Sequence, residues 1–145
     1  MAATVDATYT AQFSGTVNEY TITWKDGDGN TLNIEQVAYG QTPSYAGSTP
    51  TKTATAQYTY IFNNTWSPAI VSVTADATYI AQFDSTVNEY TITWNYRDAN
   101  GVQTQSTDTV AYGQTPIAPS LPATSQSQST VYTFTSWDPA VASIT

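Results

Sequence analysis

The sequence predicts a mostly β protein made of two small tandem modules, with little or no helix, and three observations lead to that expectation. Short segments alternate apolar and polar side chains, which is the pattern of half-buried strands. Residues 6–24 return almost unchanged at residues 76–94, so the chain contains two copies of a unit of about 70 residues. No segment shows the periodicity of an amphipathic helix, and prolines interrupt the stretches that lack strand patterns.

The expected strands follow the same order in both copies. Alternating segments lie at residues 7–13, 20–24 and 58–62, and the second copy repeats them at 77–83, 90–94 and 132–134. In the first of these, Ala, Tyr, Ala and Phe share one face, while Thr and Gln occupy the other. Val71 and Val73 are expected to start or extend the strand over residues 77–83. The aromatic faces would supply most of the buried area of so small a module.

Turn-forming residues separate these strands. Asp26-Gly27-Asp28-Gly29 and Asn100-Gly101 predict hairpin turns ahead of the two VAYGQTP segments, at residues 37–43 and 110–116. A short insertion lengthens this region in the second copy, as is typical of an exposed turn. Residues 44–57 and 117–130 are rich in Pro, Ser, Thr and Gln, and we expect them to be extended crossovers over the sheet.

Composition argues against several classes of function. The chain has no cysteine and no histidine, so disulfides, thiolate metal sites and histidine catalysis are not available to it. Its only cations are Lys25, Lys52 and Arg97, against eleven carboxylates, which gives a formal charge of −8. Nucleic-acid binding is therefore not expected, because phosphate recognition depends on cationic side chains. No apolar run approaches the roughly 20 residues of a membrane-spanning helix, so no membrane insertion is expected.

Four motifs define the repeat. YTITW opens it at residues 20–24 and 90–94, and V-A-Y-G follows at 37–40 and 110–113. An aromatic strand comes next, at 132–137, and the closing strand has the sequence ATYIAQF at 77–83. This order resembles the Listeria–Bacteroides repeat, the internalin-type B-repeat of bacterial cell-surface proteins. Phe13 and Phe83 stand where that family has a closing Trp, and residues 63–65 replace the usual Gly before Trp66. The resemblance implies a β-grasp-like module that serves as a spacer or adhesion segment, without known catalysis.

Two divisions of the chain fit the repeat. In the family's phase, residues 1–84 form the first module, in which 1–18 is the closing strand of a preceding repeat, and residues 85–145 form the second. The alternative phase gives 4–74 and 75–145, and the link between modules is expected to be as short as 84–89. In the family's phase the second copy exposes a strand edge. Residues 7–13 of another molecule would fill it, which predicts head-to-tail self-association.

The sequence DGDGN at residues 26–30 is the sharpest candidate metal site. Its candidate ligands are Asp26, Asp28 and Asn30. Alternating carboxylates separated by glycine can wrap calcium, but the later bidentate glutamate is missing, because Glu35 lies at the wrong spacing. The second copy keeps only Asp98 and Asn100 of this pattern. A polar turn is the interpretation we favour, and no cofactor is expected.

The aromatic residues have two interpretations. Trp24, Trp66, Trp94 and Trp137 lie at repeated positions, on or beside inward-facing series, which favours core packing over a carbohydrate-stacking platform. Tyr39 and Tyr112 each precede a glycine and are the rings expected to be most exposed, so they are the candidate ligand-stacking residues.

Carboxylates do not form a convincing catalytic pair. Asp138, Asp84, and Asp6 with Asp76 are the candidates for acid–base work of the kind that hydrolyses glycosides. Asp6 and Asp76, however, are the same position in two copies, and most of the others lie beside turn residues. We expect no catalytic residue and no enzyme activity.

The predicted function is a structural stalk or spacer repeat of a bacterial cell-surface adhesin. The alternative is a glycan- or protein-binding adhesion module that acts by avidity, since repeated modules multiply weak binding. An extracellular, cell-surface location is expected, because Thr, Ser, Gln, Asn and Tyr abound while charged residues are few. The expected partners are neighbouring repeats and a ligand on a host or neighbouring cell.

Overall fold

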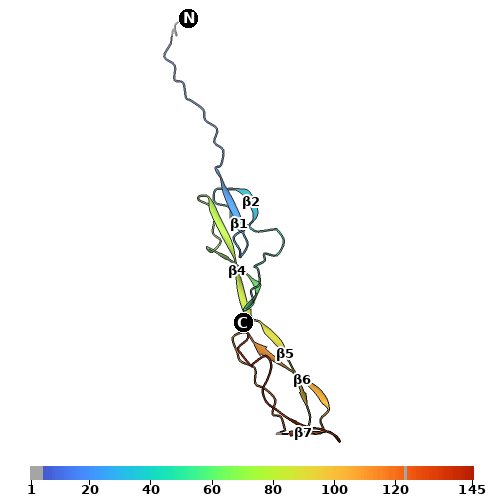
Figure 1. Cartoon of the computed structure of the whole chain (residues 1–145). Helices are drawn as coiled ribbons and strands as arrows, with labels where there is room; N and C mark the ends of the chain where they lie inside the picture. The colour runs from blue at the N-terminus through green and yellow to red at the C-terminus, as the bar shows by residue number, and fades with distance from the viewer. Residues whose placement is uncertain (1–4, 123) are drawn as a thin grey trace.

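The computed structural model describes residues 5–122 and 124–145, and β-strands are the regular elements in that part of the chain (Figure 1). The strands are β1 (Glu19–Lys25), β2 (Thr31–Ala38), β3 (Tyr58–Ser67), β4 (Ala77–Val87), β5 (Glu89–Arg97), β6 (Gln103–Ala111), β7 (Thr124–Gln126) and β8 (Val131–Thr133). The prediction of a mostly β chain without helix is confirmed for these residues.

The first half of the chain forms one four-stranded sheet in the order β2-β1-β4-β3. The central pair, β1 and β4, is parallel, with Ile22 opposite Ala77 and Trp24 opposite Tyr79. Both outer strands run antiparallel to their neighbours. β4 therefore lies between β1 and β3, where its alternate side chains enter the core.

Aromatic rings build the core of this sheet. Ile22, Trp24, Val73 and Tyr79 are its buried members. The Trp24 ring stacks on Tyr79 with centroids 5.0 Å apart, and Trp66 meets it edge-on at 4.6 Å. Each such aromatic pair contributes about 0.5–1.5 kcal/mol beyond the area it buries. The expected core role of the tryptophans is confirmed here.

The second half pairs its strands differently. β5 and β6 form a two-stranded antiparallel sheet, and β7 and β8 form another. Within the described part of the chain, no strand pairs with the second edge of β5. Trp94 is nevertheless buried, and Trp137 meets it edge-on at 4.8 Å, as Trp66 meets Trp24.

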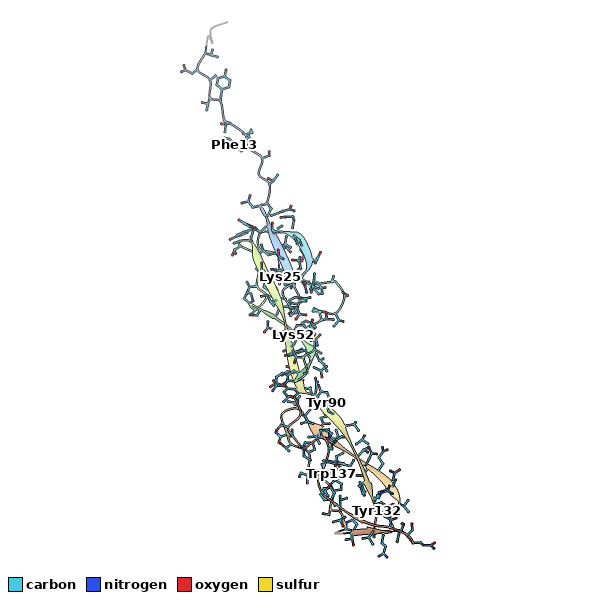
Figure 2. All side chains as sticks on the ribbon, viewed as in Figure 1. Phe13, Lys25, Lys52, Tyr90, Tyr132 and Trp137 are labelled. Carbon is cyan, nitrogen blue, oxygen red and sulfur yellow. The ribbon has the colours of Figure 1, made fainter. Side chains whose placement is uncertain are left out.

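Residues 7–13 do not form the predicted strand. They are extended but pair with no described strand, and the Tyr9 and Phe13 side chains are 89 % and 93 % exposed (Figure 2). The prediction was wrong because alternation describes a half-buried surface, and a lone segment has no partner to bury it against.

The segment before β4 also differs from the expectation. Val71 and Val73 belong to no strand, and β4 begins only at Ala77. The Val73 amide donates to the Gln41 carbonyl, and the Val73 carbonyl accepts from Gly40, at 2.8 Å each. These bonds use the backbone groups of Val73 at a corner of the fold, so the residue packs into the core without joining the sheet.

The link between the halves is shorter than the expected 84–89. β4 continues to Val87 and β5 begins at Glu89, which leaves Asn88 alone between them. The two halves follow each other end to end, and the extended segment before β1 leaves the first half at the end away from β5 (Figure 1).

Candidate functional site

The DGDGN turn is organised by an aspartate that bonds to its own backbone. Asp26 is buried, and its Oδ1 accepts from the amides of Asp28 and Asn30 at 2.9 and 2.8 Å. Its Oδ2 accepts from the Asn30 side-chain amide at 2.8 Å. The Asn30 side chain and these backbone amides hold the pKa of Asp26 below its usual value, although burial opposes them.

The other carboxylate of the turn has protein partners too. Asp28 Oδ2 accepts from the Thr53 amide at 2.8 Å and from its hydroxyl at 2.6 Å. In the second half, Asp98 Oδ1 accepts from the amides of Asn100 and Val102 at 2.8 and 2.9 Å. Asp26 and Asp98 therefore have the same role in the two copies, because each accepts backbone amides of its own turn. Within residues 5–122 and 124–145, no group of three or more Asp, Glu, His or Cys residues is placed to hold a metal ion.

The two candidate stacking residues have the same backbone setting but different exposure. The Tyr39 and Tyr112 amides donate to the carbonyls of Asn18 and Asn88 at 2.8 and 2.9 Å. Tyr39 is 57 % exposed, with its ring 6.4 Å from Tyr20, whereas Tyr112 is half-buried. The two copies therefore do not present the same ring to solvent.

Each buried tryptophan bonds to a carboxylate that the sequence analysis did not single out. Trp24 Nε1 donates to Glu35 Oε1 at 2.7 Å, and Trp94 Nε1 donates to Asp108 Oδ2 at 2.8 Å. A buried indole N–H needs such an acceptor. The signal was present in the sequence, since an acidic residue stands two positions before the VAYG motif in both copies.

The candidate acid–base carboxylates lie apart in separate structural roles. Asp76 Oδ1 accepts from the Thr21 amide at 2.7 Å and so fixes the start of β4 against β1. Asp84 accepts from the Asn63 side chain at 3.3 Å. Asp6 lies exposed in the unpaired N-terminal segment.

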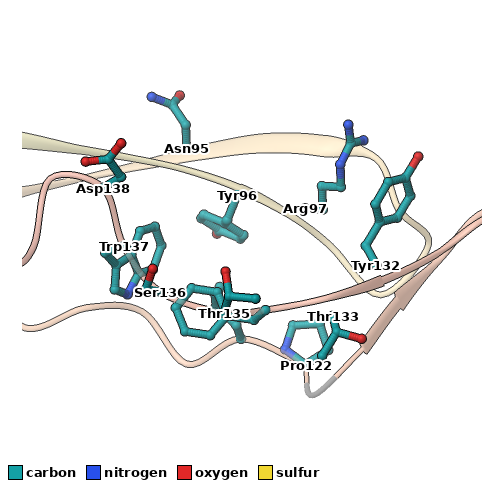
Figure 3. A pocket seen from close by; sticks show the side chains of 12 residues that line it. Asn95, Tyr96, Arg97, Pro122, Tyr132, Thr133, Thr135, Ser136, Trp137 and Asp138 are labelled. Carbon is teal, nitrogen blue, oxygen red and sulfur yellow. The ribbon is translucent and has the colours of Figure 1, made fainter.

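An open groove runs along β5 in the second half, and Figure 3 shows part of it. One cavity, of about 430 Å³, lies between residues 92–95 of β5 and the segment from Trp137 to Ile144. A second, of about 340 Å³, continues past Asn95 to Arg97 and Tyr132. Asn95, Trp137 and Asp138 line both cavities, so they form one groove.

This groove lies where the first half holds β4. In the first half, β4 fills the space between β1 and the aromatic strand β3. The aromatic side of that space is alike in both halves: Phe62 lies 5.6 Å from Trp66, and Phe134 lies 5.5 Å from Trp137. The groove therefore borders the edge of β5 that pairs with no described strand.

No protein-family model, no curated protein and no solved structure matches this chain. Among the described residues there is also no helix long and apolar enough to cross a membrane.

Proposed function

We propose that the chain is a non-catalytic structural spacer of a bacterial cell-surface adhesin, made of two tandem β-grasp-like modules. The resemblance to the Listeria–Bacteroides repeat suggested this role. Support from the structure comes from three features: the joint between the halves, the topology of the first sheet, and the contacts that recur in both halves.

The joint at Asn88 carries the proposal, because it ties the two halves together without a flexible linker. The Asn88 amide donates to the Gln57 carbonyl at 2.9 Å, and its side chain donates to the carbonyls of Thr55 and Ala56 at 2.8 and 2.9 Å. Its side-chain oxygen accepts from the Thr59 hydroxyl at 2.6 Å. These four bonds reach the first half, and the Asn88 carbonyl accepts a fifth from the Tyr112 amide of the second half at 2.9 Å. Five hydrogen bonds on one linking residue limit bending far more than a flexible linker would.

A second contact braces the same joint. The hydroxyl of Tyr90, the second residue of β5 (Figure 2), donates to the Ala56 carbonyl at 2.6 Å. An end-to-end pair held in this way keeps its length, which is what a spacer requires.

The sheet topology supports the β-grasp-like assignment. A parallel central pair flanked by antiparallel strands, in the order β2-β1-β4-β3, is the arrangement expected of such a module. Since β4 pairs within the first sheet, we place the boundary between modules at Asn88 and treat the segment before β1 as the closing strand of a preceding unit.

Recurring contacts support two copies of one module. Gly40 and Gly113 donate to the carbonyls of Val73 and Ile144, each at 2.8 Å. Thr42 and Ser72 are joined through their hydroxyls at 3.3 Å, and Thr115 and Ser143 are joined in the same way at 2.8 Å. The polar, acidic composition, with three cationic side chains against eleven carboxylates, suits an extracellular stalk.

Exposure of Tyr39 favours the alternative, a glycan- or protein-binding module that acts by avidity. We place it second because avidity needs the same surface in each repeat. Tyr39 and Tyr112 differ in exposure, and Trp24 and Trp94 are buried.

Small-angle scattering of the monomer tests the spacer function. We expect a rod-like particle of fixed length, and a Gly-Ser insertion after Asn88 should convert it into a flexible ensemble with a broader distance distribution. The same insertion after Asn18, between the unpaired segment and β1, is the matched control and should leave the arrangement of the two halves unchanged. A wild-type chain as flexible as the Asn88 insertion variant would contradict the proposal.

A further inference from the structure

We infer that the groove beside β5 is an acceptor site for a β-strand, and that its occupant is residues 6–17 of a second copy of this chain. Copies joined in this way form head-to-tail chains. The inference depends on the groove and on the unpaired segment, and it goes beyond the spacer function.

The acceptor side presents both the backbone and the apolar surface that a strand needs. β5 pairs with β6 along one edge, and its other edge faces the groove. Trp94 and Ile92 lie on the β5 side, and Trp137, Ala140 and Ile144 lie opposite them. An extended segment there gains main-chain hydrogen bonds from the edge and contacts for alternate side chains, which is the usual mode of strand addition.

The donor side carries the same inward residues as the strand that fills this place in the first half. In β4 the inward series is Ala77, Tyr79, Ala81 and Phe83, and residues 7, 9, 11 and 13 repeat it letter for letter. Tyr79 is 2 % exposed, but Tyr9 is 89 % exposed. Two segments with nearly identical sequences thus differ in burial: β4 places its tyrosine in the core, whereas residues 7–13 leave theirs in solvent.

The pairing in the first half fixes the register of the donated strand. Because Ile22 lies opposite Ala77 and Trp24 opposite Tyr79, Tyr9 of the donor would lie opposite Trp94 of the acceptor. Asp6 would accept from the Thr91 amide, as Asp76 does from Thr21.

The connection after the donated strand also repeats one already present. β4 passes through Asn88 into β5, and residues 7–17 pass through Asn18 into β1 in the same way. The donor segment leaves its own chain at the end away from the groove (Figure 1), so it cannot reach its own acceptor. The contact is heterologous and extends into open chains.

Tyr9 is the main anchor, because the groove fits Phe13 less well. In the first half Phe83 packs over Gly27, where an added Cβ would lie 2.6 Å from its ring. The second half has Ala99 at this point of the turn, and Tyr96 lies in the groove (Figure 3). The donated Phe13 must therefore sit differently from Phe83.

Sedimentation velocity over a concentration series tests the inference with the variant Thr10→Pro. The monomer should fold normally, since residue 10 pairs with nothing in it, but proline removes a ladder hydrogen bond in the donated strand. We expect the wild type to grow end to end as its concentration rises to millimolar, and Thr10→Pro to stay monomeric. Val5→Pro, which lies before the donated strand, is the matched control and should associate like the wild type.

A peptide with the sequence of residues 75–88 provides the second measurement. It should bind the full-length chain at one site, dissolve the end-to-end species and change the tryptophan emission of the chain, because the half-buried Trp137 lines the groove. Alanine at the position of Tyr79 in the peptide should weaken binding about 30-fold, as for an aromatic hot spot. A wild type that stays monomeric and binds no peptide would overturn the inference and leave the spacer function standing. Association of Thr10→Pro equal to that of the wild type would overturn it as well.

Discussion

The first half of the chain forms a four-stranded sheet, whereas the second half, which repeats the EYTITW and VAYGQTP segments of the first, forms two sheets of two strands each. Both halves place one tryptophan edge-on against another and bond the buried indole to a carboxylate. They differ in the strand that fills the centre of the first sheet, and the second half also has β7, which pairs with β8 and has no counterpart strand among the described residues of the first half. In the second half the place of that central strand is an open groove.

This difference shows which features of the fold form from neighbouring residues and which require the closing strand β4. The hairpin, its aspartate turn and the paired tryptophans form in both halves, so they do not require the closing strand. The closing strand adds Tyr79 and Ala81 to the buried core. Burying one large apolar side chain contributes roughly 1.5–3 kcal/mol, so we expect the first half to be the more stable one.

Truncation of the closing tyrosine should have the largest effect on stability. Tyr79→Ala removes the ring that stacks on Trp24, and we expect a loss of about 3–5 kcal/mol in the free energy of unfolding of the first half. Tyr9→Ala is the matched control, since this ring is exposed in the monomer, and should cost almost nothing. Urea unfolding at low protein concentration measures both, and equal losses would contradict the comparison.

Removal of the indole acceptor should have an intermediate effect that is similar in the two halves. Glu35→Leu leaves the Trp24 N–H buried without a partner, which should cost about 1–3 kcal/mol. Asp108→Leu should cost the second half a similar amount, because Trp94 makes the same bond. Glu35→Gln keeps an acceptor and should cost less. Equal free energies of unfolding for Glu35→Leu and Glu35→Gln would show that this hydrogen bond does not stabilise the fold.

The turn aspartate should give the smallest effect, visible as a pH dependence. The pKa of Asp26 is lower in the folded chain than in the unfolded one, so its contribution is present above the unfolded pKa and is lost as the pH falls through the folded pKa. Asp26→Asn should cost about 1 kcal/mol at neutral pH, since a neutral acceptor bonds less strongly. Its unfolding free energy should also fall less steeply in acid than that of the wild type. Parallel pH profiles would contradict this role.

The sequence predicted the elements that rest on local pattern. Alternation located β1, β3 and β4, and the repeat identified Trp24 and Trp94 as equivalent core residues. The Asp-Gly signals located the turn, whose bonds lie within five residues.

What the sequence could not reveal depends on contacts between distant segments. Residues 7–13 and 77–83 have almost the same letters, yet only the second lies between two strands, because pairing depends on which partner the chain brings near. Val73 has strand propensity, but its backbone is committed to Gly40 and Gln41. The groove exists because no described strand pairs with the second edge of β5, and a local sequence pattern carries no information about that missing pairing.

Amide hydrogen exchange of residues 19–24 and 89–94 tests the central difference most directly. Both segments read EYTITW, so the amides within them have nearly the same intrinsic exchange rates. In the Thr10→Pro variant at low concentration, which keeps the chain monomeric, we expect the amides of β5 that face the groove to exchange faster than their counterparts in β1. Addition of the peptide of residues 75–88 should then slow them. Equal protection of the two segments without peptide would contradict the open edge.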